Sequence, residues 1–207
     1  MDKKIAICFY GQTRTAKVLD DIYSRMDYVD FFASTWNDFK NKSSFHFMTD
    51  FETKPVDCYK FINNTHRSIY SMYRVNKLKK RYETKHNFKY DYVMWTRSEI
   101  LFYENALIDF FETVKLDNKL TILDSITEDD NGNPYLTADY AFFSASHIFD
   151  LYASGHKYFK LLDNLRLEYG GHNYHAANIL ENNIEVNRAK IKHVFQYNKK
   201  SKRDIDE

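Results

Sequence analysis

Residues 5–9 form an unbroken apolar run that ends at Tyr10 and Gly11. Such a run is typical of a buried strand in a parallel sheet, because both faces of that sheet are covered. Apolar side chains then recur at helical spacing between residues 15 and 26, and a second apolar run follows at residues 29–33. Strand, helix and strand within about 35 residues predict a right-handed βαβ unit. This unit limits the chain to folds built around a parallel sheet.

The same patterns continue along the rest of the chain. They predict a short strand near residues 56–61, a helix over residues 65–85, strands at residues 92–95, 120–123, 140–143 and 184–186, and helices over residues 107–114, 146–162 and 172–182. A chain of 207 residues fits one domain better than two, and neither a repeat nor a linker divides it. We therefore expect an α/β fold with a mixed, mostly parallel sheet flanked by helices. Residues 1–197 are expected to form a single domain and residues 198–207 a frayed tail.

The composition narrows the classes of partner and compartment. Hydrophobic residues make up 43% of the chain, and 30 basic against 29 acidic side chains leave a net charge of +1. Long disorder is therefore not expected, and a polyanion is not indicated as the main partner. The two cysteines, Cys8 and Cys58, form no CxxC motif, which argues against a structural zinc site. The first apolar run is too short for a signal peptide or a membrane span, so we expect a cytoplasmic protein.

Polar residues follow the first apolar run at the place where open α/β sheets bind ligands, beyond the carboxyl ends of the strands. These residues are Gly11, Gln12 and Arg14. A glycine lets the backbone approach a ligand closely, and the planar guanidinium of an arginine can clamp a phosphate. The segment lacks the spacing of a dinucleotide fingerprint or of a P-loop, which argues against both.

Two further groups of residues end the second and third runs. Thr35 and Trp36 follow the second run, where Trp36 either stacks on a base or packs on the core. Arg97 and Glu99 follow the third run. The Glu99 carboxylate can ligate Mg²⁺ or Mn²⁺ between two phosphates, or it can form an ion pair with Arg97. Both interpretations stay open at this point.

Candidates for acid–base chemistry lie in the second half of the chain. Asp139 directly precedes the apolar run at residues 140–143, and it either leads into that strand or supplies a carboxylate to the ligand site. His172 and His175 are three residues apart on the last helix, close enough to share a face. They predict a polar role near the start of the helix, or a metal site if a carboxylate joins them.

The helix expected over residues 65–85 carries a basic outer face. This face consists of Arg74, Lys77, Lys79, Lys80 and Arg81. Runs of this kind are most often solvated, and phosphate binding is the alternative interpretation.

Four segments of the sequence follow one another in the order of a known pattern. Residues 4–14 contain a strand and a Gly-Gln-x-Arg turn, residues 30–36 end in Ser-Thr-Trp, residues 90–100 read YDYVMWTRSEI, and residues 139–144 read DYAFFS ahead of a helix with Asp150 and Tyr152. In this order they resemble bacterial and viral glycosyltransferase-like proteins of surface-polysaccharide clusters, over about residues 3–190. The positions that differ from that family are Ser34, Trp95 and Glu99, where it usually has His, Arg and Asp.

The resemblance implies a GT-A fold, a nucleotide-binding α/β sandwich. It also implies an activity, the transfer of a sugar from a nucleotide-diphosphate sugar, expected to be UDP-linked, to a glycan hydroxyl. Carried over, Gly11, Gln12, Arg14 and Arg97 would line the nucleotide-sugar site together with Thr35 and Trp36, Glu99 would bind Mn²⁺ or Mg²⁺, and Asp139 would lie near the reacting sugar. Asp139 or His172 can then deprotonate the acceptor hydroxyl.

Two alternatives to a glycan-building transferase stay open. The chain is rich in Lys, Asn, Tyr and Phe, which an AT-rich genome such as that of a phage encodes. Together with the basic helix face, this favours a hydroxylated base in phage DNA as the acceptor. The lack of an Asp-x-Asp motif is compatible with a non-catalytic module that binds a nucleotide sugar without transferring it.

Overall fold

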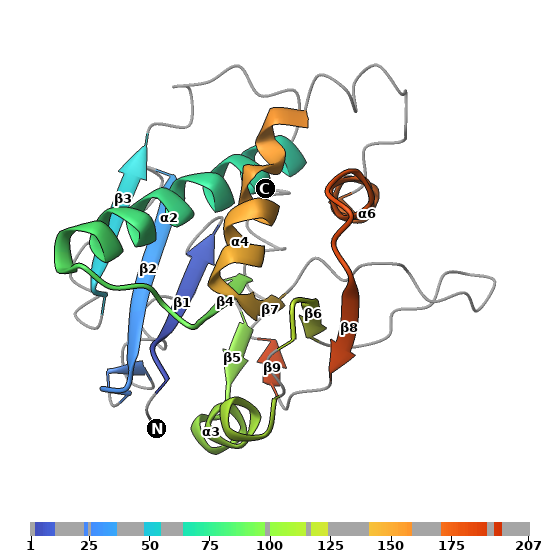
Figure 1. Cartoon of the computed structure of the whole chain (residues 1–207). Helices are drawn as coiled ribbons and strands as arrows, with labels where there is room; N and C mark the ends of the chain where they lie inside the picture. Colours follow the sequence, from blue (N-terminus) through green and yellow to red (C-terminus); the bar gives the residue numbers. More distant parts are fainter. Residues whose placement is uncertain are drawn as a thin grey trace, which may run out of the picture.

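The computed structural model of the chain describes residues 3–10, 23–24, 26–36, 48–54, 64–97, 100–114, 117–123, 141–158, 171–189 and 193–195. Within these residues a seven-stranded sheet has the order β3-β2-β1-β4-β7-β6-β8, and β5 and β9 form a separate pair (Figure 1). The strands are β1 (Ile5–Tyr10), β2 (Val29–Trp36), β3 (Asp50–Lys54), β4 (Tyr92–Arg97), β5 (Ile100–Phe102), β6 (Leu120–Leu123), β7 (Ala141–Ala145), β8 (Val186–Ala189) and β9 (His193–Phe195).

One strand of the described sheet, β7, runs against its neighbours. The pairs β1–β2, β1–β4, β2–β3 and β6–β8 are parallel, whereas β7 is antiparallel to both β4 and β6. The fold is therefore α/β with a mixed, mostly parallel sheet flanked by helices, as the sequence predicts.

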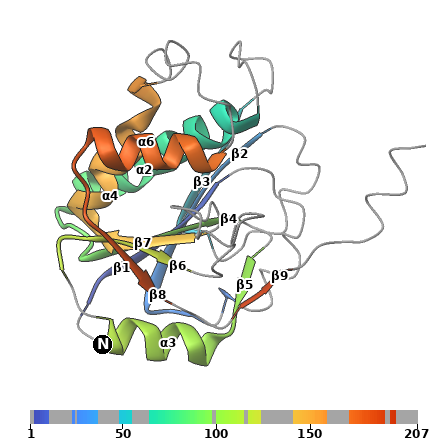
Figure 2. The same cartoon turned by 90° about the vertical axis from the view of Figure 1, so that its right-hand side faces the viewer.

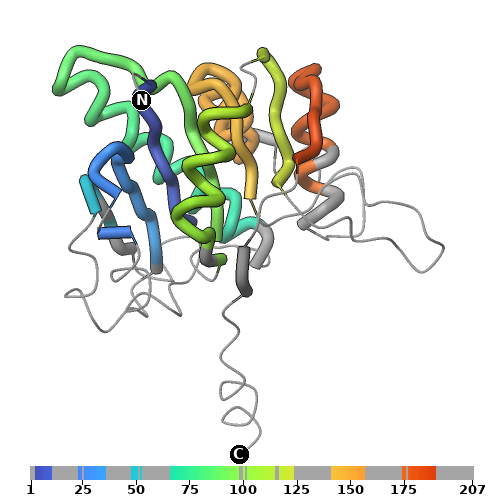
Figure 3. Tube along the Cα trace, turned by 90° about the horizontal axis from the view of Figure 1, so that it is seen from below, coloured from blue at the N-terminus to red at the C-terminus, as the bar shows by residue number. Residues whose placement is uncertain are grey.

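Helices cover both faces of the sheet. They are α2 (Asn64–His86), α3 (Glu104–Thr113), α4 (Ser146–Tyr152) and α6 (Gly171–Glu181), with a 3₁₀ helix, η2 (Ala153–Tyr158), continuing from α4. Figure 2 shows α2, α4 and α6 on one face and α3 on the other, and Figure 3 views the face that α3 crosses.

Strand β1 shows why the first apolar run has no polar interruption. All six of its residues are buried. Ile5, Ile7 and Phe9 pack in the cluster that contains the apolar residues of α3, whereas alternate residues such as Cys8 pack in the cluster formed by α2, α4 and α6. A central strand with helices on both faces must be apolar on both sides.

Helix α2 joins the sheet through one apolar stripe and ends at a clear signal. Ile69, Met72 and Val75 are buried at helical spacing. After the helix ends, Asn87 adopts a left-handed conformation with a φ of 54°, and the Phe88 N–H donates to the Glu83 carbonyl at 3.1 Å. This is the usual way in which an asparagine stops a helix.

Several elements differ from those that the patterns predict. Strand β2 continues through residues 34–36, which we expected to follow it, and the short strands β3, β5 and β9 were not predicted. Helix α4 begins at Ser146 as expected, after an N-cap residue, Ala145, that makes no side-chain hydrogen bond to it. It gives way to η2 well before residue 162. The strand expected near residues 56–61 and most of the helix expected at residues 15–26 lie outside the described residues.

Among the helices that the structure describes, none is long and apolar enough to cross a membrane.

Candidate functional site at the carboxyl edge of the sheet

The ends of three parallel strands meet at one edge of the sheet. Tyr10, the last residue of β1, pairs with Ser34 of β2 on one side and with Arg97, the last residue of β4, on the other. The three strands therefore end side by side. Residues that leave these strands start from neighbouring points, which is where doubly wound sheets bind their ligands.

The antiparallel strand β7 begins at the same edge. Its first residue, Ala141, pairs with Thr96 of β4 and with Leu123, the last residue of β6. Because β7 runs against its neighbours, the segment that leads into it arrives where β4 and β6 end. Asp139 stands two residues ahead of Ala141 in the sequence and lies outside the described residues.

Two predicted site residues end strand β2. Thr35 and Trp36 pair with Thr53 and Lys54 of β3, so they belong to the sheet and not to the following loop. Thr35 is almost fully buried, with 1% of its surface exposed. The backbone of Trp36 lies at the carboxyl edge. Whether its side chain stacks on a base or packs on the core stays open, as in the sequence analysis.

Besides Thr35, Arg97 is a predicted site residue at this edge whose side chain the structure describes. It is partly buried at the end of β4, directly after the buried Thr96. A guanidinium in this position is permanently charged and can bind two phosphate oxygens at once. Gly11, Gln12 and Arg14, which were predicted to bind the nucleotide sugar, and Glu99, which was predicted to bind the metal, lie outside the described residues.

The pair β5–β9 brings the end of the described chain to this edge. Strand β5 begins at Ile100, three residues after Arg97, and pairs antiparallel with β9 so that Phe102 faces His193 across the ladder. No prediction was made for the segment of β9. Its three residues form too short an apolar pattern to be recognised, and their pairing partner lies about 90 residues away in the sequence.

Trp95 forms part of the floor beneath the edge. Its ring stacks on Tyr10 with ring centres 3.8 Å apart and planes 16° apart, and it also contacts Phe142 at 4.8 Å. Trp95 is fully buried. The position at which the resembling family usually has an arginine is therefore a packing position in this chain.

His172 and His175 differ in their setting on α6. His172 is the second residue of the helix, and its backbone alone is described. His175 is 2% exposed, and its Nδ1 shares a hydrogen bond with the buried hydroxyl of Tyr152. His175 thus ties α6 to α4 inside the core. Among the described residues, no three His, Cys, Asp or Glu side chains gather closely enough to hold a metal ion.

A cluster of hydrogen-bonded polar residues joins the end of β2 to β3 and α2. The Ser34 hydroxyl donates to Glu52 Oε1 at 3.3 Å, and Arg74 Nε donates to the same oxygen at 2.6 Å. The Ser71 hydroxyl donates to the Ser34 carbonyl. Arg74 is 4% exposed, so its prediction as part of the outer basic face is wrong. The cluster fixes the backbone next to Tyr10, and no pattern in the sequence links residues 34, 52 and 74.

Lys79 was also predicted on the outer face and is instead fully buried. Its Nζ donates to Ser146 Oγ at 2.6 Å and to Glu83 Oε1 at 3.2 Å, and it lies 3.2 Å from Asp150 Oδ1. These contacts join α2 to α4. Lys77, Lys80 and Arg81 are exposed, as predicted.

The charges of this cluster alter the pKa values of its members. Burial opposes the ionisation of Glu83, but the hydrogen bond from Lys89, the charge of Lys79 and the bond from the Tyr90 N–H together outweigh it and lower the pKa of Glu83. Burial also raises the pKa of the nearby Cys8 thiol far above its ordinary value. Glu83 is therefore held as a carboxylate and Cys8 as a neutral thiol.

No protein-family model matches the sequence, and no curated protein matches it either.

Proposed function

We propose that the chain is a glycosyltransferase that moves a sugar from a nucleotide-diphosphate sugar, most simply a UDP-sugar, to a hydroxyl group of a glycan. The observation that carries this proposal is the common edge at which β1, β2 and β4 end and β7 begins. The segments that resemble surface-polysaccharide glycosyltransferases are the segments that end or begin there. The α/β fold, with its mixed and mostly parallel sheet, is compatible with the GT-A architecture that the resemblance implies.

The chemistry assigned to this edge has two requirements. The leaving diphosphate must be neutralised by basic side chains or by a divalent ion, and the acceptor hydroxyl must lose its proton. In the proposal Arg97 and Arg14 bind the phosphates, and Glu99 holds Mn²⁺ or Mg²⁺. Asp139 or His172 accepts the proton. Arg97 is the one of these residues whose side chain the structure describes.

A thermal-shift titration with UDP and UDP-sugars, with and without Mn²⁺, tests binding. A ligand at about 100 times its dissociation constant stabilises the folded state by about 2.7 kcal/mol. For a chain of this size that corresponds to a rise in Tm of about 5–10 °C. Arg97→Ala should remove most of this rise, whereas Lys119→Ala, at a side chain that is 37% exposed ahead of β6 and pairs with Glu185, should keep it.

The absence of a shift with every nucleotide and nucleotide sugar would contradict the proposal. A shift without release of free nucleoside diphosphate or labelling of an acceptor would instead favour the non-catalytic module. Mass spectrometry of products after incubation with UDP-sugars and a glycan mixture separates these outcomes.

A further inference from the structure

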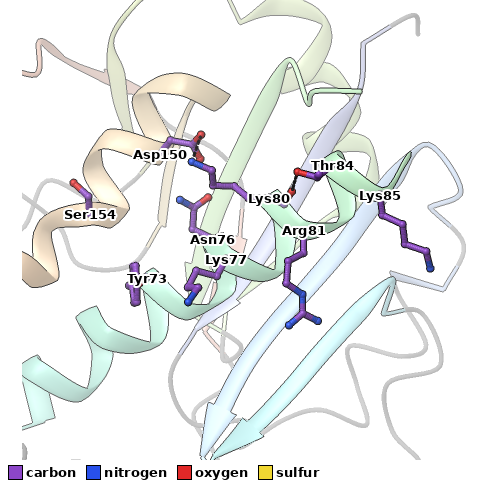
Figure 4. Close-up of a pocket in the computed structure, with 9 residues that line it drawn as sticks. All are labelled: Tyr73, Asn76, Lys77, Lys80, Arg81, Thr84, Lys85, Asp150 and Ser154. Carbon is purple, nitrogen blue, oxygen red and sulfur yellow. Dashed lines mark hydrogen bonds and ion pairs between the residues drawn. The ribbon is translucent and has the colours of Figure 1, made fainter. Parts of the chain in front are cut away.

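A hollow lies away from the carboxyl edge, on the outer side of the helical layer. It is a groove of about 630 Å³ between α2 and the segment formed by α4 and η2 (Figure 4). Helix α2 supplies most of its lining, while Asp150 and Ser154 line the opposite side. The Ser71 hydroxyl of α2 donates a hydrogen bond to the Ser34 carbonyl near the end of β2. The groove begins two residues later, at Tyr73, and runs along α2 to Lys85.

One row of groove residues repeats every four positions along α2. The row consists of Tyr73, Lys77, Arg81 and Lys85. Residues at this spacing lie on one face of a helix, about 6 Å apart along its axis, so the row extends over about 18 Å. Figure 4 shows the three cationic side chains reaching to the same side of α2. A ligand with several anionic groups along its length fits such a row.

The cations of this row are weakly neutralised. Arg81 lies 3.6 Å from Asp50 in an ion pair that is open to solvent. Lys77 and Lys85 are exposed and have no acidic partner within the described part of the chain. An incoming anion therefore does not have to displace an internal carboxylate from either lysine.

A second row faces α4 and contains a recessed hydrogen-bond acceptor. Asn76 is 5% exposed and lines the groove, and among the described residues its Oδ1 accepts no hydrogen bond. Its neighbour Lys80 is held by Asp150, with Nζ 3.3 Å from Oδ2. A buried acceptor without a donor is costly, so a ligand that brings a donor gains from filling this position. Carboxylate and phosphate groups are acceptors when ionised, so this donor must be a separate group such as a hydroxyl.

We propose that this groove binds an anionic saccharide. Its carboxylate or phosphate groups lie along Lys77, Arg81 and Lys85, and a sugar hydroxyl donates to Asn76 Oδ1. These residues lie apart from the carboxyl edge, so the inference does not depend on the transfer activity proposed above. If both proposals hold, the groove retains an acidic acceptor glycan while the edge carries out transfer.

The aromatic lining argues for a saccharide over single-stranded nucleic acid. Proteins that bind single strands offer aromatic faces on which bases stack. Tyr73 is the one aromatic residue that lines the groove within the described structure, and its ring already stacks on His156 with ring centres 3.7 Å apart. The Lys77 ammonium lies 5.5 Å from the centre of the same ring. The ring is thus engaged within the protein.

The test compares four fluorescent probes at low salt. These are hexagalacturonate, the neutral sugar maltohexaose, inorganic polyphosphate and a single-stranded oligonucleotide. The groove variant is Lys77→Gln/Lys85→Gln, and its matched control is Lys4→Gln/Lys119→Gln, which removes the same charge elsewhere. Asn76→Leu removes the recessed acceptor with little change of volume, and its urea midpoint should stay within about 0.5 M of the wild type because it removes a buried polar group without a donor.

Hexagalacturonate should bind and maltohexaose should not. The groove variant should bind hexagalacturonate about tenfold more weakly than the wild type, and the control variant less than about twofold more weakly. Both differences should shrink as the salt concentration rises. Asn76→Leu should lower the affinity for hexagalacturonate but not the affinity for polyphosphate. Arg97→Ala should leave this binding unchanged even where it abolishes nucleotide binding.

Three results would overturn the inference. One is the absence of hexagalacturonate binding, and another is equal weakening by the groove variant and its control. The third is tighter, groove-dependent binding of the oligonucleotide, which would assign the surface to nucleic acid.

Discussion

Replacing Lys79 with methionine should destabilise the protein far more than the same change at the neighbouring Lys80. Lys79 is fully buried, and its ammonium group contacts Glu83, Ser146 and Asp150 within 3.2 Å. Methionine fills similar space without the charge. The variant therefore leaves the fully buried Glu83 carboxylate without its buried cation.

The expected magnitude follows from what remains around Glu83. Breaking a buried ion pair from one side costs about 3–5 kcal/mol. In this chain Glu83 keeps the Lys89 ammonium at 2.9 Å and the Tyr90 N–H at 3.1 Å, and Asp150 keeps Lys80 at 3.3 Å. We therefore expect the lower end of that range, about 3 kcal/mol. This corresponds to a fall in Tm of about 6–12 °C for a chain of this length.

Urea unfolding followed by circular dichroism at pH 7 gives the free energy of unfolding for each variant. Lys80 is 50% exposed and pairs with Asp150 at the surface, so Lys80→Met should change that free energy by no more than about 0.5 kcal/mol. A loss below about 1 kcal/mol for Lys79→Met, or equal losses for the two variants, would refute the argument that the buried cluster joins α2 to α4.

Three further predictions concern buried polar groups and the thiol. Arg74→Leu should cost about 2–4 kcal/mol in urea unfolding because it leaves Glu52 without its 2.6 Å partner, and recovery in the double variant Arg74→Leu/Glu52→Leu would show that the cost belongs to the pair. The pKa of the Glu83 carboxyl is lower in the folded than in the unfolded chain, so its contribution to stability is complete above about pH 4.5 and is lost as the pH falls through the pKa of the folded state. Glu83→Gln should therefore reduce the loss of stability between pH 6 and pH 3. Stability curves of the variant and the wild type that run parallel over this range would contradict the prediction. Burial raises the pKa of Cys8, so in a Cys58→Ser background the native protein should react with a thiol reagent at pH 8 no faster than it unfolds, and rapid labelling without urea would show that Cys8 is accessible.

The candidate site was predicted from the sequence in outline. Apolar runs followed by polar residues are local patterns, and they located the ends of β1 and β4 to within two residues. The same patterns placed Thr35 and Trp36 just beyond β2, because Ser34 interrupts the apolar run and Asn37 and Asp38 favour a turn. Both residues instead pair with β3, which was not predicted.

The basic face of α2 shows the limit of helical periodicity. Arg74 and Lys79 have the same charge and similar spacing as Lys77 and Arg81, yet the first two are buried and the last two are exposed. The carboxylates of Glu52 and Asp150, which come from other elements, make these burials possible. Periodicity along one helix carries no information about such partners.

The amino-acid sequence alone determined that the chain forms an α/β fold, because the longer strands and helices are encoded in the spacing of their own apolar residues. Tertiary structure decided which strands are neighbours, that β7 runs against the others, and that β5 meets β9. It also decided which cations lie inside the protein. The physical reason is distance along the chain: strand pairing and most of the charge burial depend on residues about 18 to 95 positions apart, whereas periodicity is a property of short segments.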